Sequence, residues 1–369
     1  MTTPGSLLYY RGRVGLYHIL RLLGVGSGDE VILQAFTCVA VPEAVMAVGA
    51  IPVWADLAAG SVNLDADDFA AKITPRTKAV IVQHTFGMPA DLDAILPVAQ
   101  RHGIPVLEDC CHTFASKHRQ RVVGTIGAAA FWSYEWGKPI IAGVGGEAGF
   151  NDPTLQACAE SGYSRDFRPP PRKKSVVIAA QYFMFTLLYG PRRYWLVRRA
   201  FHMLGRAGVA QSNYNPVGPG AAMAADFGWQ MCGFSRRRLA RARHQAMAFL
   251  PERVRQAERY IIGLRADAAR LPVSPTGAEA VYARLPLFVR QKEILLDAAR
   301  AANLELAGWY ATAVHPLAGD ELRLVHYTLG SCPRAEAAAS TLVSLPVHPK
   351  VTPAFQDRLI AFLNRHGSA

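Results

Sequence analysis

Short apolar runs alternate with longer mixed stretches over the first 150 residues of the chain. The runs are rich in β-branched residues and predict buried strands at 31–33, 51–54, 79–83, 105–107 and 129–133. The stretches between them predict helices at 42–48, 65–72 and 91–101. This alternation indicates βαβ units, a mostly parallel sheet with helices on both faces, and ligands beyond the carboxyl ends of its strands.

The middle of the chain interrupts this alternation. Residues 165–208 contain a proline-rich basic lead-in, an apolar stretch and a basic-aromatic helix that we expect to start near Pro191. A long helical pattern resumes at Phe234 and runs to about Arg265. We therefore treat 165–208 as an insertion.

The last part of the chain mixes strands with helices. Strands are predicted at 283–289 and 321–325, and helices at 292–302, 333–342 and 353–365. The chain has 369 residues, and a domain usually takes about 150. We expect a large domain over residues 1–245 and a smaller α+β domain over residues 246–369.

The composition is that of a folded cytoplasmic protein. Hydrophobic residues make up 51% of the chain and charged residues 18%, which excludes a disordered chain. The uncharged apolar run 175–191 is shorter than the roughly 20 residues that span a bilayer. No signal-peptide pattern occurs near Met1, and the six cysteines, two of them adjacent at Cys110 and Cys111, predict reduced thiols.

The charge is high and unevenly placed. The formal net charge is +12, and ten basic residues between Arg165 and Arg206 face one acid, Asp166. Such a field attracts nucleic acid, anionic lipid or phosphorylated substrates. Composition does not choose among these partners. No recognised nucleic-acid-binding module accompanies the charge, so we expect no nucleic acid, while an anionic small-molecule substrate and an anionic lipid surface stay open.

Two candidate catalytic segments end predicted strands. Glu108 and Asp109 follow the strand at 105–107, where a buried carboxylate needs a partner that offsets its desolvation. A helix N-cap by Asp109 is the structural alternative. Lys138 follows the strand at 129–133 in an apolar, glycine-bearing context, where a desolvated lysine becomes a nucleophilic amine. A surface lysine is the alternative there.

A third segment precedes a predicted helix. Gly12, Arg13, Val14 and Gly15 lie ahead of a helix at 16–23, and small residues with a cation at a helix start suit a phosphate group.

Further short segments occur in one order along most of the chain. They are 26–32, 36–40, 84–91, 108–109, 133–138, 146–149 and the Leu-Pro-Val-His-Pro segment at 345–349. Together they resemble the DegT/StrS-type (sugar nucleotide) aminotransferases, which depend on pyridoxal 5'-phosphate (PLP). The resemblance implies an α/β protein with an aspartate-aminotransferase-like large domain (PLP fold type I) and a smaller α+β C-terminal domain.

The resemblance also assigns roles to the catalytic candidates. Lys138 would hold PLP as a Schiff base and later move the proton between the cofactor and the substrate α-carbon. Asp109 would pair with the pyridinium nitrogen and keep it protonated. His112 stands where the family has Gln or His near the cofactor ring, and a core histidine is its alternative.

The phosphate site implied by the resemblance departs from the family pattern at two positions. Ser133 and the backbone N–H groups around Gly12, Arg13 and Val14 would hold the phosphate. Arg13 replaces the usual Thr or Ser, and an arginine can bind phosphate bidentately. Cys38 replaces the aromatic residue that stacks on the cofactor ring, which weakens cofactor binding by about 1 kcal/mol.

The resemblance implies a transaminase that works as a homodimer with shared active sites. The acceptor would be a keto-sugar, nucleotide-linked, in surface polysaccharide or secondary-metabolite biosynthesis, with glutamate or glutamine as donor. Asn213 and Asn215 are candidates for the asparagine that reaches the partner's phosphate. A homologue that has lost catalysis and acts as a regulatory or binding protein is the alternative, and a PLP enzyme on a lipid-linked or non-sugar substrate is another.

The insertion leaves two interpretations open. Residues 176–189 are apolar almost all round, and Arg192, Arg193, Arg198 and Arg199 follow. Through 176–204 the protein would lie on the inner face of a membrane, with its arginines on anionic headgroups. The alternative is an arm packed into the dimer.

Overall fold

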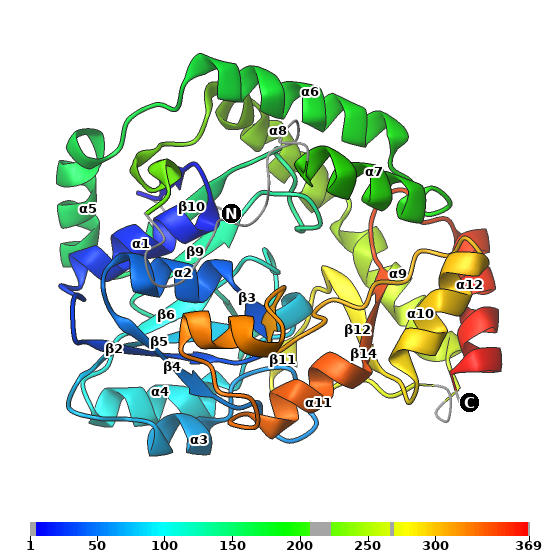
Figure 1. The fold of residues 1–369 in the computed structure, drawn as a ribbon, viewed down its shortest axis with the longest axis horizontal. Helices are drawn as coiled ribbons and strands as arrows, with labels where there is room; N and C mark the ends of the chain where they lie inside the picture. Colours follow the sequence, from blue (N-terminus) through cyan, green and yellow to red (C-terminus); the bar gives the residue numbers. More distant parts are fainter. Residues whose placement is uncertain (1–4, 207–222, 266–268, 368–369) are drawn as a thin grey trace.

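The computed structural model describes residues 5–206, 223–265 and 269–367 (Figure 1). Its centre is a seven-stranded sheet in the order β1-β10-β9-β6-β5-β2-β4. The strands are β1 Leu7–Tyr9, β2 Glu30–Gln34, β4 Ile51–Ala55, β5 Thr77–Gln83, β6 Val106–Asp109, β9 Ala129–Ser133 and β10 Gly146–Phe150. The five strands from β9 to β4 are parallel, and β10 and β1 add an antiparallel edge. The predicted α/β class with a mostly parallel sheet is confirmed.

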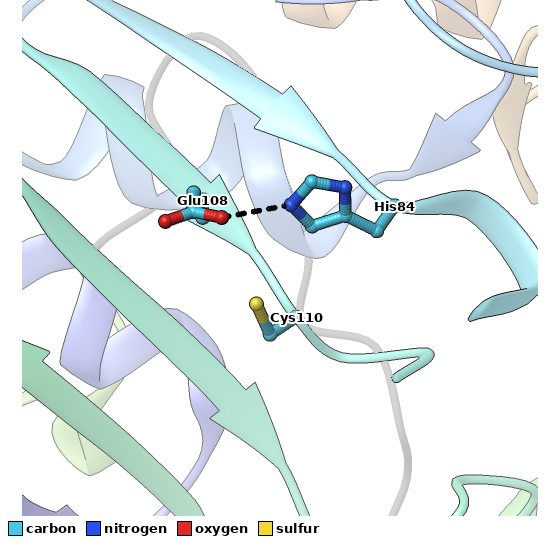
Figure 2. A group of neighbouring side chains, drawn as sticks. All are labelled: His84, Glu108 and Cys110. Carbon is cyan, nitrogen blue, oxygen red and sulfur yellow. Dashed lines mark hydrogen bonds and ion pairs between the residues drawn. The ribbon is translucent and has the colours of Figure 1, made fainter. Parts of the chain in front are cut away.

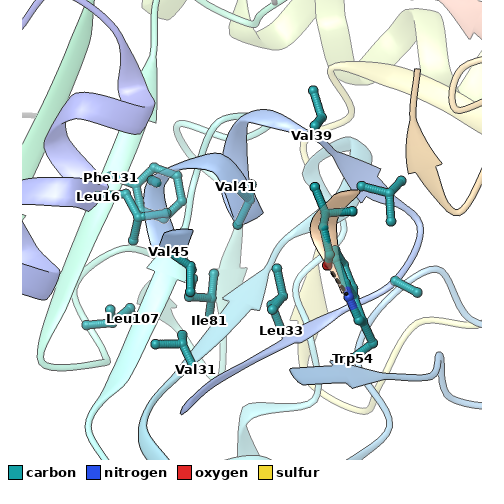
Figure 3. Packing of buried hydrophobic residues seen from close by; sticks show 14 of the residues in the cluster. Leu16, Val31, Leu33, Val39, Val41, Val45, Trp54, Ile81, Leu107 and Phe131 are labelled. Carbon is teal, nitrogen blue, oxygen red and sulfur yellow. Dashed lines mark hydrogen bonds between the residues drawn. The ribbon is translucent and has the colours of Figure 1, made fainter. Parts of the chain in front are cut away.

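Helices cover both faces of this sheet (Figure 1). One face carries α1 Gly12–Leu22 and α2 Ala40–Ala47, with α5 Pro153–Asp166 beside α1, and the other carries α3 Ala66–Ala71 and α4 Leu92–Arg101. Side chains alternate along each strand. Val31 and Leu33 pack toward α1 and α2 (Figure 3). Ile32, between them, packs toward α3 and α4. A strand with two buried faces needs a continuous apolar run, which is why these strands are visible in the sequence.

A second, smaller core lies in the C-terminal part. The antiparallel pair β12 Arg284–Phe288 and β14 Leu342–Pro346 packs with α9 Leu250–Gly263, α10 Lys292–Ala301 and α12 Pro353–His366. The helix α11 Pro333–Thr341 contributes alanines to the large core instead. The remaining short elements are β3 Thr37–Cys38, β7 Lys117–His118, β8 Arg121–Val122, β11 Ala278–Glu279, β13 Val314–His315, η1 Thr85–Gly87, η2 Ala225–Gly228 and η3 Gly319–Val325.

Several predicted elements differ in the structure. The strand expected at 321–325 is wrong: this segment is the 3-10 helix η3, because its buried residues Leu322 and Val325 are three apart and the Glu321 carboxylate accepts a hydrogen bond from the Ala318 N–H. The helical pattern predicted from Phe234 to about Arg265 is confirmed, but it divides into two helices, α8 Gly233–Ala248 and α9. The division occurs because Pro251 starts a new helix well but does not continue one.

The start of α1 and the end of β6, both near the candidate site, also differ from the predicted boundaries. The helix α1 begins at Gly12 rather than at residue 16, so the glycine pair forms its first turn. The strand β6 includes Glu108 and Asp109, and a turn rather than a helix follows it, so Asp109 is no helix N-cap.

The insertion forms two helices along one side of the molecule (Figure 1). They are α6 Arg172–Leu188 and α7 Tyr194–Arg206, and α6 packs against α8. The helix expected near Pro191 therefore begins at Tyr194, after a turn. In the part of the chain that is described, no helix combines the length and apolar content that crossing a membrane requires.

Candidate active site

The carboxyl ends of two neighbouring parallel strands bring the predicted residues to one edge of the sheet. Asp109 ends β6 and Ser133 ends β9, and Asp109 lies opposite Phe131 in the register of this pair. The start of α1 approaches the same edge. A Cβ added to Gly12 would lie 3.3 Å from the Ser133 Cβ and 3.4 Å from the Cys111 Sγ. Glycine at this position therefore permits the close approach.

The first turn of α1 suits an anion. Its N-cap residue, Arg11, makes no side-chain capping hydrogen bond, and the turn contains no acidic residue. A helix N-terminus carries partial positive charge and directs N–H groups outward. Because Ser133 borders this turn, a phosphate group fits between the Ser133 hydroxyl and the start of α1.

Lys138 lies in the loop after β9, facing aromatic and polar groups from three parts of the chain. Its Nζ lies 5.0 Å from the ring centroid of Trp309. Its positive charge acts on both Asp109 and His112, lowering the pKa of each. The lysine and the acid of the prediction thus lie within electrostatic range of each other.

Asp109 is a buried carboxylate without a basic side chain paired to it. Its Oδ1 accepts a hydrogen bond of 2.9 Å from the Cys111 N–H. Burial raises its pKa, and the Cys111 hydrogen bond and the Lys138 charge oppose this only in part. Among the described residues, no lysine or arginine lies within ion-pair distance of this carboxylate. A cationic ring nitrogen would supply the missing partner.

His112 follows β6 near the same edge of the sheet, and its ring contacts those of Phe86, Trp309 and Tyr310. Its Nδ1 accepts a hydrogen bond of 3.2 Å from the Phe86 N–H, and its Nε2 lies 3.4 Å from the Tyr310 hydroxyl. Burial, with the charge of Lys138, lowers its pKa well below the ordinary value, so the ring is neutral and its proton lies on Nε2. The hydrogen bonds and burial agree with the alternative of a satisfied core histidine, and the position near the cofactor stays a prediction.

The two residues that depart from the family pattern lie close to the site. Arg13 is buried and pairs with Glu43 of α2, so its guanidinium has a carboxylate partner within the protein. Burial raises the pKa of the Cys38 thiol, and the charges of Lys138 and Arg13 act against this. Val14 packs into the main core, and its N–H donates to the Arg11 carbonyl at 3.1 Å, so the structure gives both its side chain and its N–H partners within the protein.

The aromatic pair Trp309–Tyr310 is a part of the site that the sequence did not reveal. Trp309 contacts both Lys138 and His112, the latter with ring centroids 4.9 Å apart. About 170 residues of sequence separate this pair from Lys138, and no periodic pattern surrounds it. An aromatic doublet in a loop was the one available signal.

A neighbouring cluster has the composition of a metal site but a structural arrangement. His84, Glu108 and Cys110 place their ligand atoms within 4.8 Å of one another (Figure 2). The Glu108 carboxylate accepts hydrogen bonds from the His84 Nε2 (3.1 Å) and from the N–H groups of Gly124, Ile126 and Gly127 (2.6, 2.7 and 2.7 Å). The His84 Nδ1 accepts from the Ala90 N–H. These bonds occupy the lone pairs that a metal would need, so the cluster fastens β6 to adjacent loops.

The site residues fit PLP. An amine, a buried carboxylate that lacks a cation, and an uncapped helix start beside a serine correspond to the aldehyde, the ring nitrogen and the phosphate of that cofactor. The other two candidates, Asn213 and Asn215, lie outside the described residues.

The fold is that of the PLP-dependent enzymes of fold type I. Residues 11–168, fewer than half of the chain, match the model of the DegT/DnrJ/EryC1/StrS aminotransferase family.

Similar proteins include L-glutamine:2-deoxy-scyllo-inosose aminotransferase of Streptomyces kanamyceticus, 42% identical over 144 residues (39% of this chain, 34% of that protein). Another is the spore coat polysaccharide biosynthesis protein SpsC of Bacillus subtilis, 40% identical over 140 residues (38% and 36%). The matched segments thus span about a third of the curated relatives. The crystal structure of the aminotransferase TlmJ from Streptoalloteichus hindustanus has a TM-score of 0.71 and 26% identity, covering 98% of this chain and 85% of that one.

Proposed function

We propose that this protein is a PLP-dependent aminotransferase that moves an amino group from an amino acid to a ketone on a polyhydroxylated ring. The observation that carries the proposal is the convergence of Lys138 and Asp109 at one sheet edge, where the buried carboxylate lacks a basic partner. A structural acid would be expected to have its partners within the protein, as Glu108 does.

When bound, the cofactor would supply an electrophilic carbon and an electron-accepting ring. The residues of the chain would hold and orient the cofactor and carry the protons that the reaction moves. Lys138 binds the cofactor through its amine and carries protons at that amine during transfer. Asp109 accepts a hydrogen bond from the ring nitrogen and stabilises its charge. Ser133 and the N–H groups of the first turn of α1 bind the phosphate.

The proposed acceptor is a keto-sugar, nucleotide-linked, and the proposed donor is glutamine or glutamate. The names of the relatives support a ring ketone and glutamine, since one is an L-glutamine:2-deoxy-scyllo-inosose aminotransferase. The net charge of +12 favours an anionic acceptor such as a sugar diphosphate. The name of SpsC supports a role in polysaccharide biosynthesis, and those of the inosose enzymes a role in secondary metabolism. We further propose a cytoplasmic homodimer.

Borohydride trapping tests the proposal without requiring the substrate. Purified protein is incubated with PLP, reduced with borohydride, digested and analysed by mass spectrometry. We expect a visible absorbance band before reduction and a pyridoxyl adduct on Lys138 afterwards, both absent from Lys138→Ala. The surface variant Lys78→Ala is the control, because Lys78 is exposed on β5.

The second candidate function is a regulatory or binding homologue without catalysis. Arg13 and Cys38 favour it, because both replace residues that bind the cofactor in the family. Colourless protein that gives no Lys138 adduct with PLP would support this candidate over the enzyme.

A further inference from the structure

One face of α6 exposes a continuous apolar stripe. Its members are Val176, Ala180, Phe183, Met184 and Leu187, which lie on one side of the helix because they recur about once per helical turn. The exposed fractions of Val176, Phe183 and Leu187 are 68%, 64% and 79%. Single exposed apolar residues are ordinary, but a contiguous patch marks a surface that binds something.

The opposite face of α6 is fixed to the protein. Tyr182 is buried and carries the Arg238 guanidinium of α8 4.1 Å above its ring. The ring centroid of Phe185 lies 4.3 Å from that of Trp136, two residues before Lys138. The stripe therefore points outward from a helix that packs against the lysine loop.

The end of the helix and the start of α7 are held by the C-terminal part. The Tyr189 hydroxyl donates to the Glu305 Oε1 at 2.7 Å, and the Lys350 Nζ donates to the carbonyls of Thr186 and Tyr189 at 2.6 and 2.7 Å. The Trp195 Nε1 donates to the Leu304 carbonyl at 2.8 Å. Because the end of α6 and the start of α7 are held in this way, the stripe cannot turn inward without breaking these bonds.

Cations flank the stripe at both ends. Arg172 and Lys173 are exposed at the start of α6, and Arg192, Arg193 and Arg199 are exposed on the following turn and α7. Leu196 and Met203 extend the exposed apolar surface along α7. The one acid between Arg165 and Arg206, Asp166, is paired with Arg165 at 2.8 Å.

We propose that this α6–α7 surface seats the protein on an anionic lipid bilayer. Apolar side chains that enter the interface, bordered by arginines at headgroup level, are what such a surface requires. A second copy docked on the same face would bring two sets of like charges together, which is unfavourable. Nucleic acid would use the arginines but leave the stripe in water. The 17 residues of α6 lie along the interface rather than across it.

Vesicle co-sedimentation of the full-length protein tests this proposal. We expect binding to vesicles of phosphatidylcholine with 30% phosphatidylglycerol and none to phosphatidylcholine alone. Val176→Ser/Leu187→Ser should reduce partitioning about tenfold through lost apolar insertion. Arg192→Gln/Arg193→Gln/Arg199→Gln should reduce it by at least tenfold, since each cation near the surface contributes about fivefold.

Matched variants elsewhere provide the controls. Leu329→Ser/Ile294→Ser removes apolar residues of similar exposure, 70% and 66%, from other surfaces, and Lys78→Gln/Arg101→Gln removes exposed cations outside the insertion. Both should bind like the wild type. Trapping of PLP on Lys138 should be unchanged in every variant, which separates this proposal from that of catalysis.

Three results would overturn the proposal. The first is no sedimentation with anionic vesicles. The second is equal loss in the control variants or none in the serine variant, which would indicate nonspecific charge adsorption. The third is a shift from dimer to monomer in light scattering when the stripe is changed, with vesicle binding retained, which would make the surface a contact between copies.

Discussion

Two buried carboxylates, Asp109 at the sheet edge and Glu305 in the C-terminal part, show how a site differs from a structural cluster. Glu305 accepts hydrogen bonds from Arg284 (2.8 Å), Tyr189 (2.7 Å) and His348 (3.1 Å). Asp109 accepts hydrogen bonds from a single residue of its own loop, Cys111. Although burial alone favours the protonated acid, His348 and Arg284 lower the pKa of Glu305 to about 2. For Asp109 burial dominates and raises the pKa. A carboxylate satisfied within the chain stabilises the fold, whereas one left short of partners is available to a ligand.

The largest expected effect is a loss of activity at Lys138 with no loss of stability. Lys138→Ala should lower transamination by about a thousandfold or more, because it removes the amine that binds the cofactor and carries protons. The unfolding midpoint in urea should stay near that of the wild type, since Lys138 is partly exposed. Retained turnover in this variant would remove Lys138 from the chemistry.

Glu305→Gln should cost stability rather than activity of the folded protein. The change leaves the buried Arg284 without its carboxylate, a loss of about 3 kcal/mol in the free energy of unfolding. Urea denaturation measures it, and Asp320→Asn on the surface is the control, with no change expected. If Glu305→Gln unfolded at the same urea concentration as the wild type, Glu305 would not have the stabilising role assigned to it here.

The dependence of the free energy of unfolding on pH should show the contribution of the Glu305 carboxylate. The folded pKa of Glu305 is about 2 and its ordinary value is 4.5, so its stabilisation is complete above pH 4.5 and is lost as the pH falls toward 2. Glu305→Gln should therefore lose less stability than the wild type over this range. Equal acid sensitivity of the two proteins would show that other groups dominate.

Asp109→Asn should have the opposite profile from Glu305→Gln. Activity should fall about a hundredfold, because an amide does not stabilise a charged ring nitrogen. The stability of the cofactor-free protein should be unchanged or slightly higher, since a poorly paired buried charge is removed. Glu108→Gln on the other face of β6 is the matched control. It should destabilise the protein, because one amide oxygen cannot replace the acceptors that four donors now use.

The smallest expected effect is on the affinity for PLP, at Cys38, where the family has an aromatic residue that stacks on the cofactor ring. Cys38→Phe restores the aromatic residue of the family and should tighten PLP binding about fivefold, the gain expected of one stacking contact. Titration of the visible absorbance measures it. A weaker affinity in the variant would mean that the space around Cys38 is already used by other groups.

Much of the large unit could be predicted because its signals are local. The strands β2, β4, β5 and β9 are apolar on both faces, and Gly12, Asp109, Ser133 and Lys138 adjoin predicted elements. The segment 321–325 was misassigned because a short apolar run suits a strand or a 3-10 turn equally well without its contacts. The domain boundary between residues 245 and 246, and the catalytic roles, stay predictions.

By itself, the sequence determined the alternation of strands and helices, the order of the family segments, and the presence of a basic, apolar insertion, because each depends on neighbours along the chain. Only the tertiary structure decided that Trp309 faces Lys138, that Arg13 pairs with Glu43, and that Glu108 and Asp109 differ in how far they are satisfied. These facts depend on contacts between distant segments. Burial and hydrogen-bond partners, which set the energy of a charge, exist only once those segments have packed together.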